Sequence, residues 1–358
     1  MAETQLKLDP ASDARILIIR LTALGDVVYA LPALAAVRRH CPKAHIAWAV
    51  EEAAAGLLHG HPQLDELIVV PRKTWQKNLQ RGRLLGVLGE VRRFRSRLRL
   101  GRFEYAIDLQ ANLRGALVAR ASGARHTIGF APPCNRERAH LLLGHRITVD
   151  PALHKLQRNL ALLEALGVPT ADAAGVIPEP DAAARAMADD LLRPLGAGRA
   201  FALIHPGVSR FGSFKQWPEE NYVQLCGMLG SQGLAVVLSA GPGEEELAAR
   251  IARQAGGAPV AKGLGLPALA HLMRRAAVVI GSDTGPIQMA WMAGAPTVAL
   301  MGPKDPAIYG PLGERHRKLV AALLPCRPCR KRQCADNRCM KEIAAEAVLA
   351  AAISIAKR

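Results

Sequence analysis

The sequence predicts an α/β protein with two open parallel sheets, each covered by helices on both faces. The chain has 358 residues, a length that suits two domains better than one. Half of its residues are apolar but only 4% are aromatic, so Ala, Leu and Val must fill the core. Short β-branched runs alternate with helix-compatible segments, which is the pattern of a parallel sheet with helical crossovers.

The first half of the chain begins with a buried strand and then alternates between the two element types. The strands are expected at residues 15–20, 45–50, 68–70 and 105–108. Between them, helical segments are expected at residues 27–39, from about residue 51, and across the basic stretch 75–100. Residues 169–180 are rich in Ala, Asp, Gly and Pro without a clear period, so they predict a linker.

The second half restarts the same alternation after a helix at about 181–195. Strands are expected at residues 201–205, 235–239, 277–280 and 297–301, and helices at residues 218–232, 244–255, 285–293 and 342–358. We therefore expect an N-terminal domain over residues 1–175, a C-terminal domain over residues 176–341 and a final helix over residues 342–358. Two such sheets would bind ligands at the carboxyl ends of their strands.

The net charge of +17 is concentrated in two basic blocks. Residues 72–102 carry a net charge of +10 and residues 315–341 carry +8, which leaves the rest of the chain near neutral. Such blocks suit a polyanion, either nucleic acid, an anionic membrane face or a phosphorylated acceptor, and the alternative is a solvated helix face. The sequence has no apolar run long enough for a membrane span and a polar N-terminus, so a cytoplasmic protein is expected.

Each half places polar residues and glycines between a strand and a helix. In the first half, Thr22, Ala23, Gly25 and Asp26 follow the first strand. Asp26 would stand at a helix N-terminus, where the helix dipole favours a carboxylate. This residue is a candidate general base, and the alternative is that it only caps the helix.

In the second half, two loops of this kind can bind an anion. One runs from His205 through Ser209 to Lys215, and the other contains Asp283, Thr284 and Gly285. Backbone N–H groups at a helix start, together with one lysine, suit a phosphate, so the pair suggests a diphosphate. Neither loop has the Walker pattern, which disfavours a P-loop NTPase.

Together these segments resemble bacterial lipopolysaccharide heptosyltransferases, glycosyltransferase family 9. The resemblance spans roughly residues 15–320, and it is closest to the members that add the first heptose to the inner core. Its motifs are RLTALGDVVYALPAL at 20–34, IAWAVEE at 46–52, IDLQ at 107–110, HPG at 205–207, KQWP at 215–218, SDTG at 282–285 and MGPKDP at 301–306.

The resemblance implies a GT-B fold, in which two Rossmann-like domains have parallel sheets that face a central cleft. It also implies that the last helix can cross back to the first domain. The donor would be ADP-heptose, bound mainly by the second domain, and the transfer would invert the anomeric centre. The acceptor would be a lipid A–Kdo type molecule at the cytoplasmic face of the inner membrane, where the protein would bind peripherally.

Roles for single residues follow from the same resemblance. Asp26 matches the proposed base, Lys215 the lysine on the donor phosphates, and Asp283 an acid that contacts the donor sugar. The other residues expected to bind the donor are Thr22, Ala23, Gly25, Ser209, Glu244, Thr284, Gly285 and Gln288. Gln288 and Tyr29 depart from the family pattern, since many members have His at both positions. No metal is expected in catalysis, because Lys215 and backbone amides can stabilise the departing diphosphate.

Four cysteines lie close together near the C-terminus, at Cys326, Cys329, Cys334 and Cys339. Four thiolates at this spacing can bind a structural Zn or Fe ion, and the alternatives are reduced thiols or disulfides.

For the basic block at 72–102, we expect acceptor or membrane binding through Arg92, Arg93, Arg95, Arg97 and Arg99. Within the fold, the alternatives are a transferase with another nucleotide sugar or a protein acceptor, or a nucleotide-sugar epimerase. Outside it, the alternative is a basic four-cysteine nucleic-acid-binding protein, which the scarcity of aromatic residues disfavours.

Overall fold

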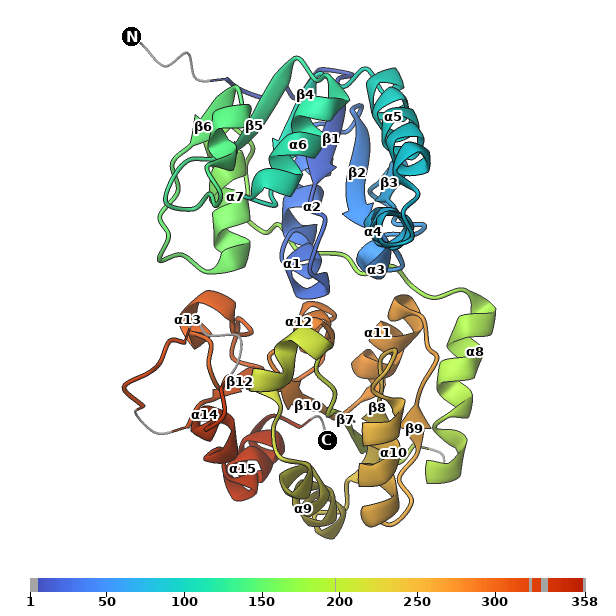
Figure 1. Ribbon diagram of the computed structural model, residues 1–358. Coiled ribbons are helices and arrows are strands. Elements are labelled where there is room, and N and C mark those ends of the chain that lie inside the picture. Colours follow the sequence, from blue (N-terminus) through green and yellow to red (C-terminus); the bar gives the residue numbers. More distant parts are fainter. Residues whose placement is uncertain (1–5, 197, 322–323, 330–333, 357–358) are drawn as a thin grey trace. The chain divides into compact units, whose positions relative to one another are not determined.

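The computed structural model describes residues 6–196, 198–321, 324–329 and 334–356. The chain forms two compact units, Met1–Pro178 and Glu179–Arg358. Each unit is a parallel sheet between two layers of helices (Figure 1). The predicted α/β class with two parallel sheets is thus confirmed.

The first unit contains a six-stranded parallel sheet that begins at its centre with β1 (Arg15–Ile19). Across the sheet, the strands run in the order β3 (Glu66–Val70), β2 (His45–Glu51), β1, β4 (Tyr105–Asp108), β5 (His126–Phe130) and β6 (His145–Ile147). Four of the five β1 residues are buried, since helices cover both faces of the sheet. All six carboxyl ends meet at one edge of the sheet because every pairing is parallel.

In the first unit, two of the expected helices are each divided into two shorter helices. They are α1 (Leu24–Val28), α2 (Leu31–His40), α3 (Glu52–Ala55), α4 (Arg72–Gln80), α5 (Leu84–Leu100), α6 (Leu113–Ser122) and α7 (Lys155–Ala165), with a short 3₁₀ helix at Ala139–Leu142. The helix expected at 27–39 is divided, and Pro32 stands in the first turn of α2, where its missing N–H costs nothing. The helix expected across 75–100 is divided near Gly82, whose φ of 73° is left-handed.

The second unit repeats this architecture. Its sheet runs in the order β12 (His316–Leu319), β11 (Thr297–Leu300), β10 (Val278–Ser282), β7 (Phe201–His205), β8 (Ala235–Ser239) and β9 (Val260–Ala261). Its α-helices are α8 (Ala182–Asp190), α9 (Glu219–Ser231), α10 (Glu245–Gln254), α11 (Leu266–Arg275), α12 (Gly285–Met292), α13 (Pro306–Tyr309), α14 (Arg338–Lys341) and α15 (Ala345–Ile355). Two 3₁₀ helices, at Arg193–Leu195 and Arg210–Lys215, precede and follow β7.

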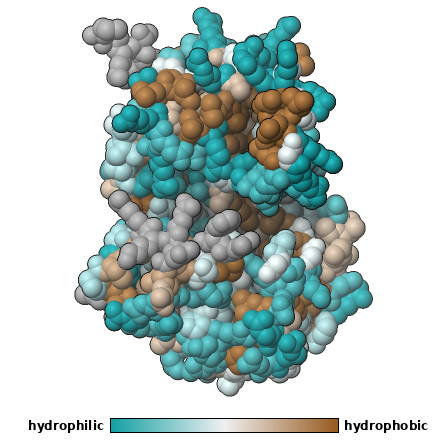
Figure 2. Space-filling view, viewed as in Figure 1, coloured by the Kyte–Doolittle hydropathy of each residue, from teal (hydrophilic) through white to brown (hydrophobic). Residues whose placement is uncertain are grey.

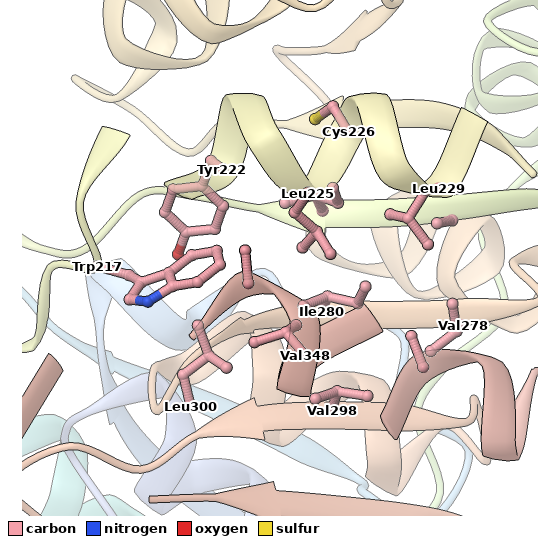
Figure 3. Packing of buried hydrophobic residues seen from close by; sticks show 14 of the residues in the cluster. Trp217, Tyr222, Leu225, Cys226, Leu229, Val278, Ile280, Val298, Leu300 and Val348 are labelled. Carbon is pink, nitrogen blue, oxygen red and sulfur yellow. The ribbon is translucent and has the colours of Figure 1, made fainter. Parts of the chain in front are cut away.

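The C-terminal helix α15 belongs to the core of the second unit (Figure 3). Its Val348 is buried with Leu300 of β11 and with Trp217 and Tyr222, whose rings meet edge to face at 4.7 Å. The Trp217 indole also donates to the carbonyl of Ile343 at 2.9 Å, just before α15. The expected contact of this helix with the first domain stays a prediction, as does the cleft between the two sheets. Within the described residues, no helix is both long and apolar enough to cross a membrane.

Candidate functional site

Asp26 lies just past β1, at the carboxyl edge of the first sheet. Its Oδ1 atom is 2.8 Å from Arg20 Nη2 and 3.3 Å from Lys155 Nζ, and the backbone N–H of Ala23 donates to Oδ2 at 3.4 Å. Arg20 directly follows β1, whereas Lys155 is the first residue of α7. The fold thus brings a carboxylate between two cations, one of which is 129 positions away in the sequence.

These two cations set the protonation state of Asp26. Burial by itself would raise the pKa of the Asp26 carboxyl, but the charges of Arg20 and Lys155 outweigh this effect and hold the pKa well below its usual range. The side chain is still 28% exposed, so a ligand can reach it. Asp26 is therefore ionised at neutral pH, and it becomes a stronger base when a ligand draws one of the cations away.

The turn that carries Asp26 is fixed by Gln110, which follows β4. Gln110 Oε1 accepts hydrogen bonds from the backbone N–H groups of Leu21 at 2.9 Å and Thr22 at 3.1 Å. Strands β1 and β4 are neighbours in the sheet, so the two loops lie side by side. A side chain from one loop thereby holds the backbone of the other.

A second carboxylate, Glu51, holds two arginines at the same edge. Its Oε1 atom accepts from Arg114 Nη1 at 2.7 Å, and its Oε2 atom accepts from Arg72 Nε at 2.8 Å. Arg114 also donates to Thr22 Oγ1 at 3.3 Å. The Glu51 side chain is buried, whereas about two fifths of each arginine side chain is exposed. The cluster therefore presents a net positive charge to solvent.

A cavity of about 150 Å³ opens beside Asp26. Gln110 and Asn112 contribute polar groups to its wall, and its cationic lining consists of Arg20, Arg136, Lys155 and Arg158. Asp26 is the one acidic residue among the lining residues, so positive charges exceed negative ones by three. Such a cavity suits an anionic ligand whose reacting group lies next to Asp26.

Asp108, the last residue of β4, is fully buried behind this turn. Its Oδ1 atom accepts from the backbone N–H of Gln110 at 2.8 Å, and its Oδ2 atom has no hydrogen-bond partner in the described part of the chain. Burial raises the pKa of the Asp108 carboxyl to about 7, although the Gln110 N–H and the Arg20 charge oppose this rise.

We expect Asp108→Asn to stabilise the protein more as the pH rises from about 5 to about 8. The folded-state pKa of Asp108 lies above the ordinary value of 3.8 for an aspartate in the unfolded chain, so its contribution to stability is complete at low pH and is lost as the pH rises through about 7. The asparagine does not titrate, so its gain in stability between pH 5 and pH 8 is about 3 kcal/mol, from about two pKa units at 1.36 kcal/mol each. Thermal unfolding of both proteins across this range measures the difference, and a pH-independent difference would contradict the assignment.

In the second unit, Lys215 and Asp283 form an ion pair at the carboxyl edge of the sheet. Lys215 Nζ is 2.5 Å from Asp283 Oδ2 and 2.7 Å from the backbone carbonyl of the same residue. The other carboxylate oxygen of Asp283 accepts from Gln288 Nε2 at 2.7 Å. Gln288 in turn accepts at Oε1 from the Trp291 indole and donates to the carbonyl of Tyr309. Asp283 is therefore held on both sides, and Lys215 keeps one N–H for a ligand.

Helix α12 begins beside this pair. Thr284 is its N-cap residue, and Pro286 occupies the first turn, where its missing N–H is not needed. The Thr284 Oγ1 atom is buried and has no hydrogen-bond partner within the described residues. The helix start, the unpartnered hydroxyl and the adjacent Lys215 together make a site that suits a phosphate.

Glu244, just before α10, faces the loop after β7 rather than open solvent. Its Oε2 atom accepts from the backbone N–H of Gly241 at 2.9 Å and lies 3.4 Å from His205 Nε2. Burial lowers the pKa of His205, although the Glu244 charge opposes this effect, so the imidazole is neutral. A Cβ atom at Gly207 would lie 2.2 Å from Glu244, so only glycine permits this approach.

Comparison with known proteins decides the family. Residues 91–340 match the profile of glycosyltransferase family 9 (heptosyltransferase). This chain belongs to glycosyltransferase family 9. It is 29% identical over 323 residues to lipopolysaccharide heptosyltransferase 1 of Pseudomonas aeruginosa. The aligned region covers 89% of this chain and 87% of the relative.

Two solved structures share the fold of this family 9 chain. A glycosyl transferase family 9 protein from Veillonella parvula has a TM-score of 0.80 and 25% identity, with 98% of each chain covered. The E. coli heptosyltransferase WaaC with ADP-2-deoxy-2-fluoro heptose has a TM-score of 0.72 and 24% identity, with 93% of this chain and 97% of that one covered. The expected family, and with it the expected enzyme class, is confirmed.

The structure of this family 9 enzyme divides the candidate residues between its two units. Thr22, Ala23 and Gly25 lie with Asp26 in the β1–α1 turn of the first unit. The others, all in the second unit, are Ser209, Lys215, Glu244, Asp283, Thr284, Gly285 and Gln288. Ser209 is the N-cap residue of the 3₁₀ helix that ends at Lys215, without a capping hydrogen bond from its side chain. Of the two departures from the family pattern, Gln288 supports Asp283, and Tyr29 is buried against His154 at 5.2 Å between ring centroids.

The arginines expected to bind acceptor or membrane lie on α5, and all five are exposed: Arg92, Arg93, Arg95, Arg97 and Arg99. Arg97 also lies 3.6 Å from Glu66 of β3. None of them lines the cationic cavity beside Asp26.

The expected four-thiolate metal site is not supported by the structure. The four cysteines are free and line one cavity of about 40 Å³. Cys326 and Cys334 are exposed, whereas Cys339 of α14 is buried. Among the described residues, no group of three or more His, Cys, Asp or Glu side chains is arranged to bind a metal ion. The disulfide alternative is also not what the structure shows.

The sequence pattern does not single out the cations around Asp26. Arg20 stands at the end of an apolar strand, and Lys155 begins a helix that was not expected. Arg136 and Arg158 lie outside the two basic blocks, so the charge distribution did not single them out. The best available signal was their position after β5 and β6, where ligand-binding residues of a parallel sheet gather.

Proposed function

We propose that this enzyme transfers a heptose from ADP-heptose to the inner core of lipopolysaccharide, with inversion at the anomeric carbon. The observation that carries the proposal is Asp26, an ionised carboxylate that lies beside a cavity with an excess of three positive charges. An acceptor with acidic sugars, such as Kdo, has the charge that suits this cavity. The names of the P. aeruginosa relative and the E. coli structure agree with this substrate class.

In the proposed reaction, Asp26 accepts the proton of the acceptor hydroxyl while that oxygen attacks the anomeric carbon. Anionic groups of the acceptor bind the lining cations, including Lys155 and Arg20, and so weaken the ion pairs that keep Asp26 a poor base. Binding of the correct acceptor would thereby activate the base. Glu51 holds Arg72 and Arg114 at the same edge, where they can bind further anionic groups of the acceptor.

The donor diphosphate would bind in the second unit. Lys215, the hydroxyl of Thr284 and the first N–H groups of α12 offer one positive charge and several donors to its oxygens. These groups stabilise the negative charge that grows on the leaving ADP, so the bond can break without a metal ion. Asp283, held by Gln288, would accept from a sugar hydroxyl of the donor, and Glu244 is the candidate for the ribose.

The acceptor in this proposal is a lipid, so the enzyme would work at the cytoplasmic face of the inner membrane. Exposed arginines of α5 support peripheral binding to anionic lipid, since each one that faces such a surface contributes about 1 kcal/mol. A structural metal stays a separate prediction from the spacing of Cys326, Cys329, Cys334 and Cys339, because the described residues show no metal-binding group. Metal analysis of the purified chain tests it.

A thermal-shift screen against ADP, UDP, GDP and their sugars tests the donor directly. A ligand that binds only the folded protein raises the melting temperature. We expect ADP and ADP-heptose to give the largest shifts, and Asp283→Asn to reduce the shift of the sugar nucleotide more than that of ADP. A larger shift with a uridine or guanosine nucleotide would contradict the ADP-heptose donor and favour another transferase or an epimerase.

A further inference from the structure

Helix α5 carries large apolar side chains on its exposed surface. Leu84 is 61% exposed, Leu85 is 85% exposed and Leu88 is 65% exposed. All three lie in the first two turns of this helix of 17 residues. The helix is anchored to the unit by other residues, among which Val87 and Leu98 are buried. Figure 2 shows apolar surface on the side of the first unit where Figure 1 draws α5, with hydrophilic residues around it.

These leucines share one face of α5 with three of its arginines. At about 100° per residue, Leu84, Leu88, Arg92, Arg95 and Arg99 fall within a sector of about 80°, and Leu85 lies next to it. Arg93 and Arg97 point to the other side, where Arg97 lies near Glu66. We call the set Leu84, Leu85, Leu88, Arg92, Arg95 and Arg99 the Leu–Arg face.

The chain connections place the apolar half of this face at the functional edge. Strand β3 ends at Val70, α4 and α5 follow, and the chain re-enters the sheet at the start of β4. Since β3 and β4 are parallel, α5 begins near the carboxyl edge and ends near the amino edge. The leucines therefore lie toward the edge that carries Asp26, and Arg99 lies toward the opposite edge.

The charge on this face indicates which kind of partner covers it. The one acidic residue of α5, Glu90, lies on another side of the helix, where Asn78 donates to it at 3.4 Å. The face thus offers three leucines and three guanidinium groups with no carboxylate. Arginine side chains of this kind lie along apolar surface and extend to phosphates, whereas leucines enter the acyl boundary.

We propose that the Leu–Arg face of α5 lies flat in the surface of an anionic bilayer, with the leucines inserted and the arginines on lipid phosphates. This inference rests on the proposed function in one respect, which is that the acceptor is a lipid. Such an acceptor would reach the site from the membrane to which the face binds. It assigns membrane binding to three of the five arginines and adds an apolar part that charge alone does not provide.

The test is sedimentation of the full-length protein with vesicles of phosphatidylglycerol and phosphatidylcholine at a ratio of about 3:7. Leu84→Ser with Leu85→Ser and Leu88→Ser should lower the partition coefficient about tenfold or more. Arg92→Gln with Arg95→Gln and Arg99→Gln should also lower it about tenfold or more. The matched control, Arg93→Gln with Arg97→Gln, should change it by less than about threefold.

Salt separates the two parts of the interaction. Binding through arginines weakens at about 0.5 M salt, whereas the insertion of the leucines does not. The arginine triple variant should therefore approach the wild type at high salt, and the leucine triple variant should stay weak at both salt concentrations. All changed side chains are exposed, and unchanged circular dichroism and melting temperature would show that the variants fold.

Two outcomes among the variants would overturn the proposal. One is a leucine triple variant that sediments like the wild type, and the other is a control pair that loses as much binding as the arginine triple. A wild-type chain that stays in the supernatant would also overturn it, and would leave a protein partner for this face. Transfer to a deacylated, water-soluble acceptor should remain normal in the leucine variant. If the wild type itself did not transfer sugar to this acceptor, that result would count against the proposed function. The vesicle experiment would still test the membrane proposal.

Discussion

Asp26→Asn should lower turnover by roughly 10²–10⁴-fold, the usual loss when a general base is removed, and should leave ADP binding nearly unchanged. The asparagine cannot take up the acceptor proton, whereas the donor site in the second unit is untouched. Steady-state kinetics with both substrates and calorimetry with ADP measure the two effects. A loss of donor affinity with normal turnover would show that Asp26 binds or caps instead.

The control for this variant is Lys155→Met, which removes one of the two cations on Asp26 but keeps the carboxylate. We expect a higher KM for the acceptor, because the anionic ligand loses a cationic partner, and a much smaller change in turnover than in Asp26→Asn. The variant also raises the pKa of Asp26, so the acidic limb of its pH–rate profile should move to higher pH. Equal losses of turnover in the two variants would contradict the separation of these roles.

Lys215→Gln should weaken donor binding about 10–100-fold and lower turnover as well, since its charge faces the diphosphate before and during departure. Glutamine is chosen because it can still donate to Asp283 Oδ2, the carboxylate oxygen that Lys215 contacts, while Gln288 keeps its bond to Oδ1. Calorimetry with ADP and single-turnover kinetics measure the two losses. Unchanged ADP affinity would contradict the role of Lys215, and a matched fall in melting temperature without weaker binding would make the residue structural.

The strands could be predicted more closely than the helices. Strands at 105–108 and 201–205 have their expected bounds, because short apolar runs between polar residues identify buried parallel strands. The basic stretch 75–100 predicts one helix because the residues on both sides of Gly82 are equally basic and compatible with a helix. The structure instead divides it at Gly82. Strands β5 and β6 were missed because HTIGF and HRI mix polar and apolar residues, and β6 is the edge strand of the sheet.

For the site, residues beside a strand end could be predicted and distant partners could not. Asp26, Lys215 and Asp283 can be singled out because each lies in a segment that leads from a strand to a helix, and their roles stay predictions. The partner that decides the chemistry of Asp26 lies elsewhere in the sequence, since Lys155 is 129 positions away. Lys215 and Asp283 were each singled out, but their ion pair across 68 positions was not. Only tertiary packing brings such charges together. The four-cysteine spacing allowed a metal site, but spacing does not determine how the thiols are oriented.

Transfer from ADP-heptose to a Kdo-containing lipid acceptor, followed by mass spectrometry and by NMR of the new glycosidic bond, is the most direct measurement of the account. We predict a product heavier by one heptose, with the anomeric configuration opposite to that of the donor and with undiminished yield in the presence of a chelator. Asp26→Asn should form this product far more slowly under the same conditions. Retention of configuration, or transfer from a uridine or guanosine sugar in preference to ADP-heptose, would contradict the account.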